Sequence, residues 1–323
     1  MLRLVRDPKS IVGVLISIAG IYWAFKDFHF FDFKESILQI DLIYLILATL
    51  FLWVSVWFRG LRWKWLFKKN NSPTITSLYR AELIGYFGNN VLPLRLGELM
   101  RSYIVGKENS LSKSFVFGTV VIERLMDTLA LTAFALLLLL TYPLPDAIKG
   151  NILQGGILLF ILLIVLIILL NHVYNIQTEN RIMNIIKLFF EGLSSIRKEM
   201  IIPVIMSSLL IWCIYLLDVY LIQKAFQFNL SWLQVLAVLV ISSLALSIPS
   251  APGMIGTFHA AVKYTMVDLF AFSANDGNSF AILMHAYGYL LLTSLGAYYF
   301  MKSQFHKKAM ESVLDMDSNY HQN

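Results

Sequence analysis

Residues 115–140 read FVFGTVVIERLMDTLALTAFALLLLL, an apolar run interrupted only by Glu123, Arg124, Asp127 and three threonines. About 20 apolar residues in an α-helix cover the hydrocarbon core of a bilayer, so this stretch is long enough to span a membrane. Each ionised residue at the centre of such a helix costs about 2.5–3.5 kcal/mol on insertion scales. The three charged side chains must therefore be paired or hydrated within the bilayer.

The composition of the whole chain agrees with a membrane protein. Of 323 residues, 58% are hydrophobic and 14% charged, and the mean hydropathy is +0.69. These values exclude soluble domains, a disordered chain, a disulfide-built scaffold and a nucleic-acid binder with an exposed basic face. The net charge of +6 is typical of a polytopic protein that gathers Lys and Arg in its cytoplasmic loops.

Apolar runs of spanning length recur along the chain and predict an all-α, polytopic helical bundle. Two further segments are apolar but broken, 81–105 at Pro93 and 233–270 at Pro249 and Pro252. We expect about six full spans plus these two broken segments, which are re-entrant or paired half-helices, in one transmembrane domain over 1–301 with a short polar cytoplasmic tail over 302–323. The six predicted spans are 11–25, 41–58, 115–140, 152–170, 201–222 and 280–300.

Lysine and arginine counts predict the orientation. With both termini cytoplasmic, the stretches 1–10, 59–114, 171–200 and 302–323 hold 20 of the 26 basic residues, and the opposite loops hold four. Both ends of the segment around Pro93 then lie on the cytoplasmic side, and both ends of the segment around Pro249 lie on the outer side.

Residues 173–200 have the pattern of an amphipathic helix at the membrane surface. Ile182, Ile185 and Phe189 fall on one side, and Arg181 and Lys187 are available to anionic lipid. The alternative is a solvated loop helix.

The segment around Pro93 carries the first candidate substrate-binding group. A backbone break at membrane depth persists only where protein or water satisfies the freed amides and carbonyls. Asn89 and Asn90 can cap the loose ends, and Pro93 can open a new helix with a partially positive amino end.

Arginines and an acid follow this break at helical spacing. Arg95, Glu98 and Arg101 fall at i, i+3 and i+6, so Glu98 can pair with either arginine but hardly with both equally. One guanidinium is then available for an anion, and phosphate matches its planar fork.

The second group is the charged interruption of residues 115–140. Glu123 and Asp127 share a helix face at i, i+4, and Arg124 can reach Asp127 at i+3. Together the two groups hold three arginines and three acids, which permits one neutral buried cluster. Such a cluster either encloses a wet, anion-attracting chamber or serves only as a salt-bridge lock between helices.

The third group is the break at residues 249–259, which read PSAPGMIGTFH. Two prolines and two glycines end one half-helix, start another and leave room for a substrate to approach. The two histidines of this group are satisfied core residues, or as a pair they bind phosphate or relay a proton. The group comprises Pro252, Gly253, Gly256, His259 and His285.

Three ordered motifs make a family resemblance specific. The runs NNVLPLRLGELMR at 89–101, ERLMD at 123–127 and PSAPGMIGTF at 249–258 resemble the lysylphosphatidylglycerol synthase transmembrane family, also called flippase-like or UPF0104 proteins. The resemblance covers nearly the whole apolar chain and implies an inner-membrane protein related to the lipid-flipping half of bifunctional aminoacyl-phosphatidylglycerol synthases. It gives functional weight to Arg95, Gly97, Glu98, Arg101, Glu123, Arg124, Asp127, Pro252, Gly253 and Gly256.

Two departures from the family pattern are informative. The family commonly has an acid three residues after the last glycine of its PGxxG motif, where this chain has His259. The aminoacyl-transferase domain of the bifunctional members is missing, so we do not expect lysyl transfer.

The sequence therefore predicts a lipid translocase in the inner (plasma) membrane that handles the anionic head group of a phospholipid or polyprenyl phosphate. The alternatives are a non-transporting partner or scaffold of envelope lipid enzymes and, with less support, an intramembrane lipid-modifying enzyme. The chain has no GxxxxGK[ST], HExxH or GxSxG motif. We expect no enzymatic activity, cofactor, metal or nucleic-acid partner; the expected partners are membrane lipids, with a homo-oligomer or an envelope enzyme as further partners.

Overall fold

The computed structural model describes residues 18, 22, 30–68, 72–92, 95–173, 180–246 and 252–320, and only the backbone at 32, 171–173 and 304–320. Most of the predicted span at 11–25 lies outside the described residues, as do Pro93 and Pro249. Every regular element in the described ranges is helical, which confirms the all-α class.

The helices follow one another in this order: α2 (Phe30–Leu38), α3 (Leu42–Lys64), α4 (Ile75–Val91), α5 (Gly97–Glu108), α6 (Lys113–Thr141), α7 (Asp146–Val173), α8 (Arg181–Leu193), η3 (Lys198–Met200), α9 (Ile201–Ala225), α10 (Trp232–Ala245), η4 (Pro252–Met254), α11 (Thr257–Lys263), η5 (Tyr264–Leu269) and α12 (Ala274–Tyr320). Of the short elements, η3 and η4 are 3₁₀ turns and η5 is a π-helical turn.

Five stretches of helix are long and apolar enough to cross a membrane: Leu42–Lys64, Lys113–Thr141, Asp146–Leu170, Lys198–Ala225 and Ala274–Ser303. They confirm the five predicted spans that fall within the described residues. The second span is longer than predicted, because α3 continues past Phe58 to Lys64. Its start is set by Asp41, whose carboxylate accepts a hydrogen bond from the Ile43 amide at 2.9 Å.

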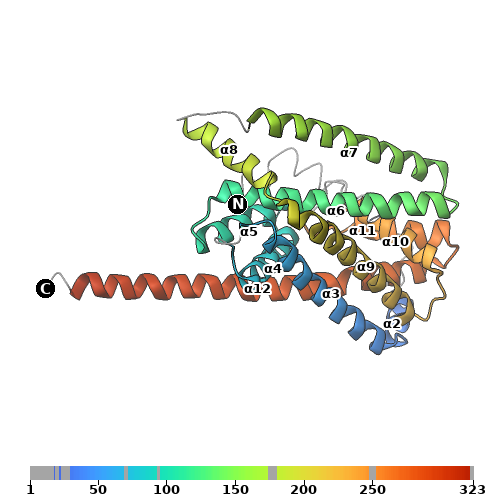
Figure 1. The fold of residues 1–323 in the computed structure, drawn as a ribbon. Helices are drawn as coiled ribbons and strands as arrows, with labels where there is room; N and C mark the ends of the chain where they lie inside the picture. The colour runs from blue at the N-terminus through green and yellow to red at the C-terminus, as the bar shows by residue number, and fades with distance from the viewer. Residues whose placement is uncertain are drawn as a thin grey trace.

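Helices α6, α7 and α12 run in similar directions, and α3 and α9 run together at an angle to them (Figure 1). Helix α9 packs along α3, and α12 packs on α4 and on α11. Helix α7 lies beside α6 at the edge of the bundle. Only 6% of its most apolar stretch is buried inside the protein, so lipid would cover most of this helix. Helix α12 continues as one helix through the predicted tail to Tyr320.

Both predicted broken segments divide into shorter helical elements. Helices α4 and α5 lie on either side of the first break and pack closely, since a Cβ on Gly88 would lie only 2.7 Å from the Gly97 Cα. The second segment divides into α10, η4 and α11. Helix α5 begins at Gly97, and Pro93, which the sequence suggested as the start of a new helix, lies outside the described residues.

Helix α8 is amphipathic, as predicted for this region, and residues 174–179 before it lie outside the described ranges. Ile182 is 70% exposed, while Phe189 packs into the core beside α6. The close approach of α8 to α6 requires glycine on both helices: a Cβ on Gly118 would overlap the backbone of Gly192, and one on Gly192 would overlap that of Gly118.

Candidate functional site

Helices α3 and α6 bring two arginines against two acids. Arg59 and Arg62 are one turn apart on α3, and Glu123 and Asp127 are one turn apart on the facing side of α6. Arg62 donates to Glu123 Oε1 at 2.9 Å and to Asp127 Oδ1 at 2.7 Å, and Arg59 Nη2 lies 3.1 Å from Asp127 Oδ2. Glu123 and Asp127 therefore share a face as predicted.

The helix pair α4 and α5 adds a third arginine and two further acids. Arg101 Nη1 contacts Glu82 and lies 3.0 Å from Glu123 Oε2, while its Nη2 lies 2.8 Å from Glu98 Oε2. Arg59 Nε lies 3.6 Å from Glu82 Oε2, which ties α3 to α4. The guanidinium of Arg101 thus joins α4, α5 and α6 at one point.

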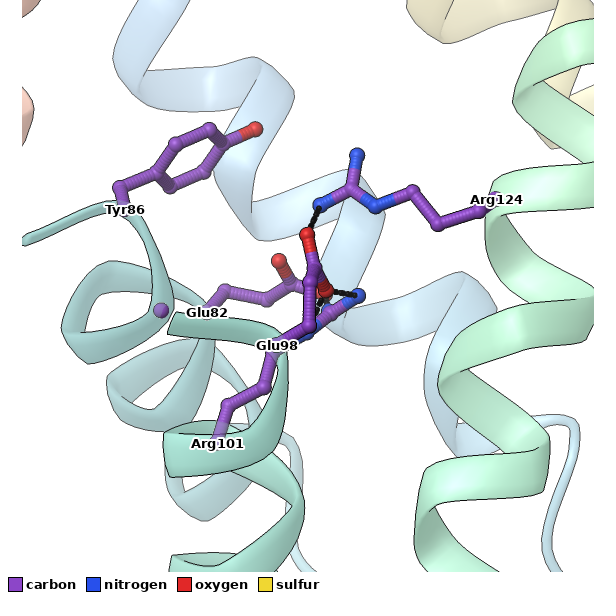
Figure 2. Close-up of a pocket in the computed structure, with 6 residues that line it drawn as sticks. Glu82, Tyr86, Glu98, Arg101 and Arg124 are labelled. Carbon is purple, nitrogen blue, oxygen red and sulfur yellow. Dashed lines mark hydrogen bonds and ion pairs between the residues drawn. The ribbon is translucent and has the colours of Figure 1, made fainter. Parts of the chain in front are cut away.

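Glu98 and Arg124 form the edge of this group, where Arg124 reaches from α6 toward Glu98 on α5 (Figure 2). Their closest atoms, Arg124 Nη2 and Glu98 Oε1, are 2.6 Å apart, and the side chains are 40% and 19% exposed. Arg124 also lies 3.5 Å from Asp127, as its i, i+3 spacing predicts. Asn89 donates to Glu98 Oε1 at 3.2 Å.

We call this group the ion-pair network. Carboxylates and guanidiniums buried in a membrane are tolerated when they are paired, because an uncompensated charge there is strongly destabilising. Four positive and four negative side chains make the network formally neutral. Its members are Arg59, Arg62, Glu82, Glu98, Arg101, Glu123, Arg124 and Asp127.

The network is closed. The space lined by Glu82, Gly85, Tyr86, Glu98, Arg101 and Arg124 has no room for a water molecule (Figure 2). Of the two alternatives that the sequence left open, the packing at these six residues favours the salt-bridge lock over a wet chamber in this conformation. The physical reason is that every guanidinium in the network already has carboxylate partners.

Arg95 is the predicted guanidinium without a carboxylate. It sits at the joint of α4 and α5 with a left-handed φ of 54°, its side chain is exposed, and its Nη2 lies 3.9 Å from the Met254 sulfur in η4. In the described ranges it forms no ion pair. Because Glu98 pairs with Arg101 and Arg124, the guanidinium that stays available along this helix is that of Arg95.

The two broken segments meet beside α12. Asn90 of α4 donates to Thr293 Oγ1 at 2.7 Å, and its carbonyl oxygen accepts from the Tyr289 hydroxyl at 3.5 Å. Gly253 of η4 has a φ of 70° and packs against the same Tyr289 ring. Within the described residues, Asn89 and Asn90 bond to side chains of other elements, where the sequence suggested helix caps.

The two predicted histidines are neighbours. The rings of His259 on α11 and His285 on α12 are 4.8 Å apart and nearly perpendicular, and Phe258 stacks on His285 at 5.1 Å. The Gly256 amide donates to His259 Nδ1 at 3.5 Å, and Gly256 itself has a φ of 100° that a glycine adopts freely. These contacts favour the reading of His259 as a satisfied core residue.

Sequence reasoning missed three members of the network. Arg59 and Arg62 were counted as loop charges because the apolar run ends at Phe58, although their i, i+3 spacing continues the helix. Glu82 lies inside the apolar segment that was recognised as broken, where an acid is itself a signal. In the part of the chain that the structure describes, no three His, Cys, Asp or Glu side chains come together as metal ligands.

The fold and the buried charges define a multi-pass α-helical membrane protein with broken helices and a neutral ion-pair network. The chain belongs to the family described as lysylphosphatidylglycerol synthase TM region, whose profile matches residues 10–296.

Its relatives include archaeal proteins named UPF0104 membrane protein. One from Methanocaldococcus jannaschii is 29% identical over 56% of this chain and 79% of its own length. One from Methanothermobacter thermautotrophicus is 24% identical over 70% of this chain and 75% of its own length. No solved structure matches the chain.

Proposed function

We propose that this protein is a lipid translocase that holds an anionic head group, that of a phospholipid or a polyprenyl phosphate, against Arg95. One observation carries this proposal: Arg95 is exposed, has no carboxylate partner in the described ranges, and lies where the α4–α5 joint touches η4. Broken helices that meet from different parts of the chain are the usual setting of a transporter's binding site. A guanidinium there offers phosphate two parallel hydrogen bonds.

The closed network supports a role in the transport cycle. Glu98 links the α4–α5 pair to α6 through its 2.6 Å contact with Arg124, which is the most exposed ion pair of the network. Separating these helices would open the space that is filled in the present conformation. We infer that the structure represents a closed state and that the Glu98–Arg124 pair separates when a head group enters.

The proposal includes an orientation. The excess of basic residues in alternate loops supports an orientation in which both termini lie on the cytoplasmic side of the plasma membrane. Although Arg59, Arg62 and Arg101 belong to the bundle rather than to loops, the bias remains without them.

Lipid transfer in reconstituted vesicles tests the proposal. Purified protein is placed in vesicles with fluorescent phosphatidylglycerol or polyprenyl phosphate, and an added quencher reports arrival in the outer leaflet. Each charge-assisted hydrogen bond contributes about 1.5–3 kcal/mol, so Arg95→Ala should weaken head-group binding roughly 10- to 100-fold. Arg80→Ala is the matched control, because Arg80 is an α4 arginine that pairs with Glu108 at the surface. Equal transfer by wild type and Arg95→Ala would contradict the assignment.

The dense packing of the network favours a second candidate, a non-transporting membrane partner of envelope enzymes in which the network locks helices together. Under that reading purified protein alone moves no lipid, and it copurifies with an enzyme. Recovery of chemically altered lipid from the same vesicles would instead indicate an intramembrane enzyme.

A further inference from the structure

Asp218 on α9 is a buried acid that stands apart from the ion-pair network. The residue is 6% exposed. The Tyr287 hydroxyl of α12 donates to its Oδ2, and its Oδ1 is buried without a hydrogen-bond partner. No lysine or arginine of the described ranges pairs with it, whereas every acid of the network has at least one arginine partner.

Among the residues that the structure describes, none offers Asp218 a positive charge. On α9 itself, Tyr215 lies one turn earlier and accepts a hydrogen bond from Arg59 at 3.4 Å. Arg59 is in turn committed to the acids of the network. Helix α10 carries no titratable side chain, and of those on α12 only Tyr287 bonds to Asp218. Val219 and Ile222, which follow Asp218 on α9, belong to the apolar core.

An unpaired carboxylate in such a place is strongly disfavoured, while the neutral acid is tolerated. Acids within membrane spans commonly serve as proton carriers. We propose that Asp218 is a membrane-embedded proton-binding site: a proton from water adds to Oδ1, Tyr287 continues to donate to Oδ2, and the same proton leaves when the site opens to water.

The position of Asp218 connects proton binding to the candidate lipid site. Tyr287 lies on α12 between His285 and Tyr289, and Tyr289 contacts both Gly253 and the Asn90 carbonyl. Protonation or deprotonation of Asp218 therefore acts where α9 meets α12, the helix that contacts both broken segments. A proton gradient would then drive head-group movement, and this coupling, unlike proton binding itself, rests on the proposed function.

Infrared difference spectroscopy of the full chain in lipid nanodiscs tests proton binding directly. We expect a protonated carboxyl C=O band near neutral pH that shifts in D₂O and is lost in Asp218→Asn. Tyr287→Phe, which keeps the acid and removes its hydrogen-bond donor, should retain the band at a shifted frequency. If Asp218→Asn folds poorly, Tyr287→Phe alone decides. A wild-type spectrum without such a band, or a band unaffected by either variant, would overturn the proposal.

Lipid transfer with and without an imposed pH gradient tests the coupling. We expect the gradient to accelerate transfer by wild type and the ratio of the two rates to fall to one in Asp218→Asn. If wild type moves no lipid but the Asp218 band is present, the proposed function fails and the proton site stands. If transfer occurs with the same gradient response in both proteins, the coupling fails and the proposed function stands.

Discussion

The substitution Glu123→Gln probes the centre of the ion-pair network. Glu123 is fully buried and faces three arginines, with distances of 2.9 Å to Arg62, 3.0 Å to Arg101 and 3.4 Å to Arg59. Glutamine keeps the volume but removes the negative charge, so the network would hold four cations and three anions. The amide nitrogen of glutamine would also face guanidinium N–H groups, from which it cannot accept a hydrogen bond.

The expected loss of stability follows from these contacts. Three charge-assisted hydrogen bonds at about 1.5–3 kcal/mol each set an upper limit on the loss of unfolding free energy. Each arginine keeps another acid, however, because Glu82, Glu98 and Asp127 remain. Removing one partner from a buried charge pair typically costs about 3–5 kcal/mol. We expect Glu123→Gln to lower the free energy of unfolding by about that amount.

Unfolding by sodium dodecyl sulfate in mixed micelles, followed by circular dichroism, measures this loss. Glu108→Gln is the matched control, because Glu108 pairs with Arg80 at 3.3 Å with both side chains more than a third exposed, and surface pairs contribute up to about 1 kcal/mol. The double variant Glu123→Gln with Arg62→Gln restores neutrality and should lose less than the sum of the single variants. A loss below about 1 kcal/mol for Glu123→Gln, equal to the control, would refute the reasoning, since it would mean that the network is hydrated.

Two further predictions concern the elements that place the site. Gly97→Ala should separate α5 from α4 and lower the free energy of unfolding by about 1–3 kcal/mol, because the added Cβ would overlap the Gly85 carbonyl oxygen and lie 2.6 Å from Asn89 Oδ1. The same detergent titration measures this loss. Unchanged stability would contradict the close packing of the two helices. Ser231→Ala should lower the free energy of unfolding by about 1 kcal/mol, because it removes the capping box with Gln234 at the start of α10. We expect faster amide hydrogen exchange that is confined to the first turn of α10. Unaltered exchange in that turn would contradict the prediction.

Span positions could be predicted because insertion into lipid depends on local sequence. A run of about 20 apolar residues leaves the chain few alternatives, and the run at 115–140 reappears within α6. The breaks were predictable for the same reason, since proline and glycine act on their own backbone. The i, i+4 face of Glu123 and Asp127 likewise follows from helix geometry alone.

Partner choice within the site could not be predicted, because it depends on how distant helices cross. Glu98 has Arg95 and Arg101 within reach along the chain, yet its shortest contact is with Arg124 of another helix. Arg59 and Arg62 became network members only because α3 packs against α9 and approaches α6. Whether the charges enclose water also depends on how the helices pack. Here carboxylates, rather than water molecules, occupy the positions around the guanidiniums.

The zero sum of charges in the ion-pair network determines how a membrane voltage acts on it. An electric field does work of about 2.3 kcal/mol per elementary charge moved through 100 mV. Four cations and four anions that shift together carry no net charge across the field. Motions that keep the pairs intact are therefore electrically silent, whereas a bound head group or a proton that moves with the site adds charge that the voltage can drive.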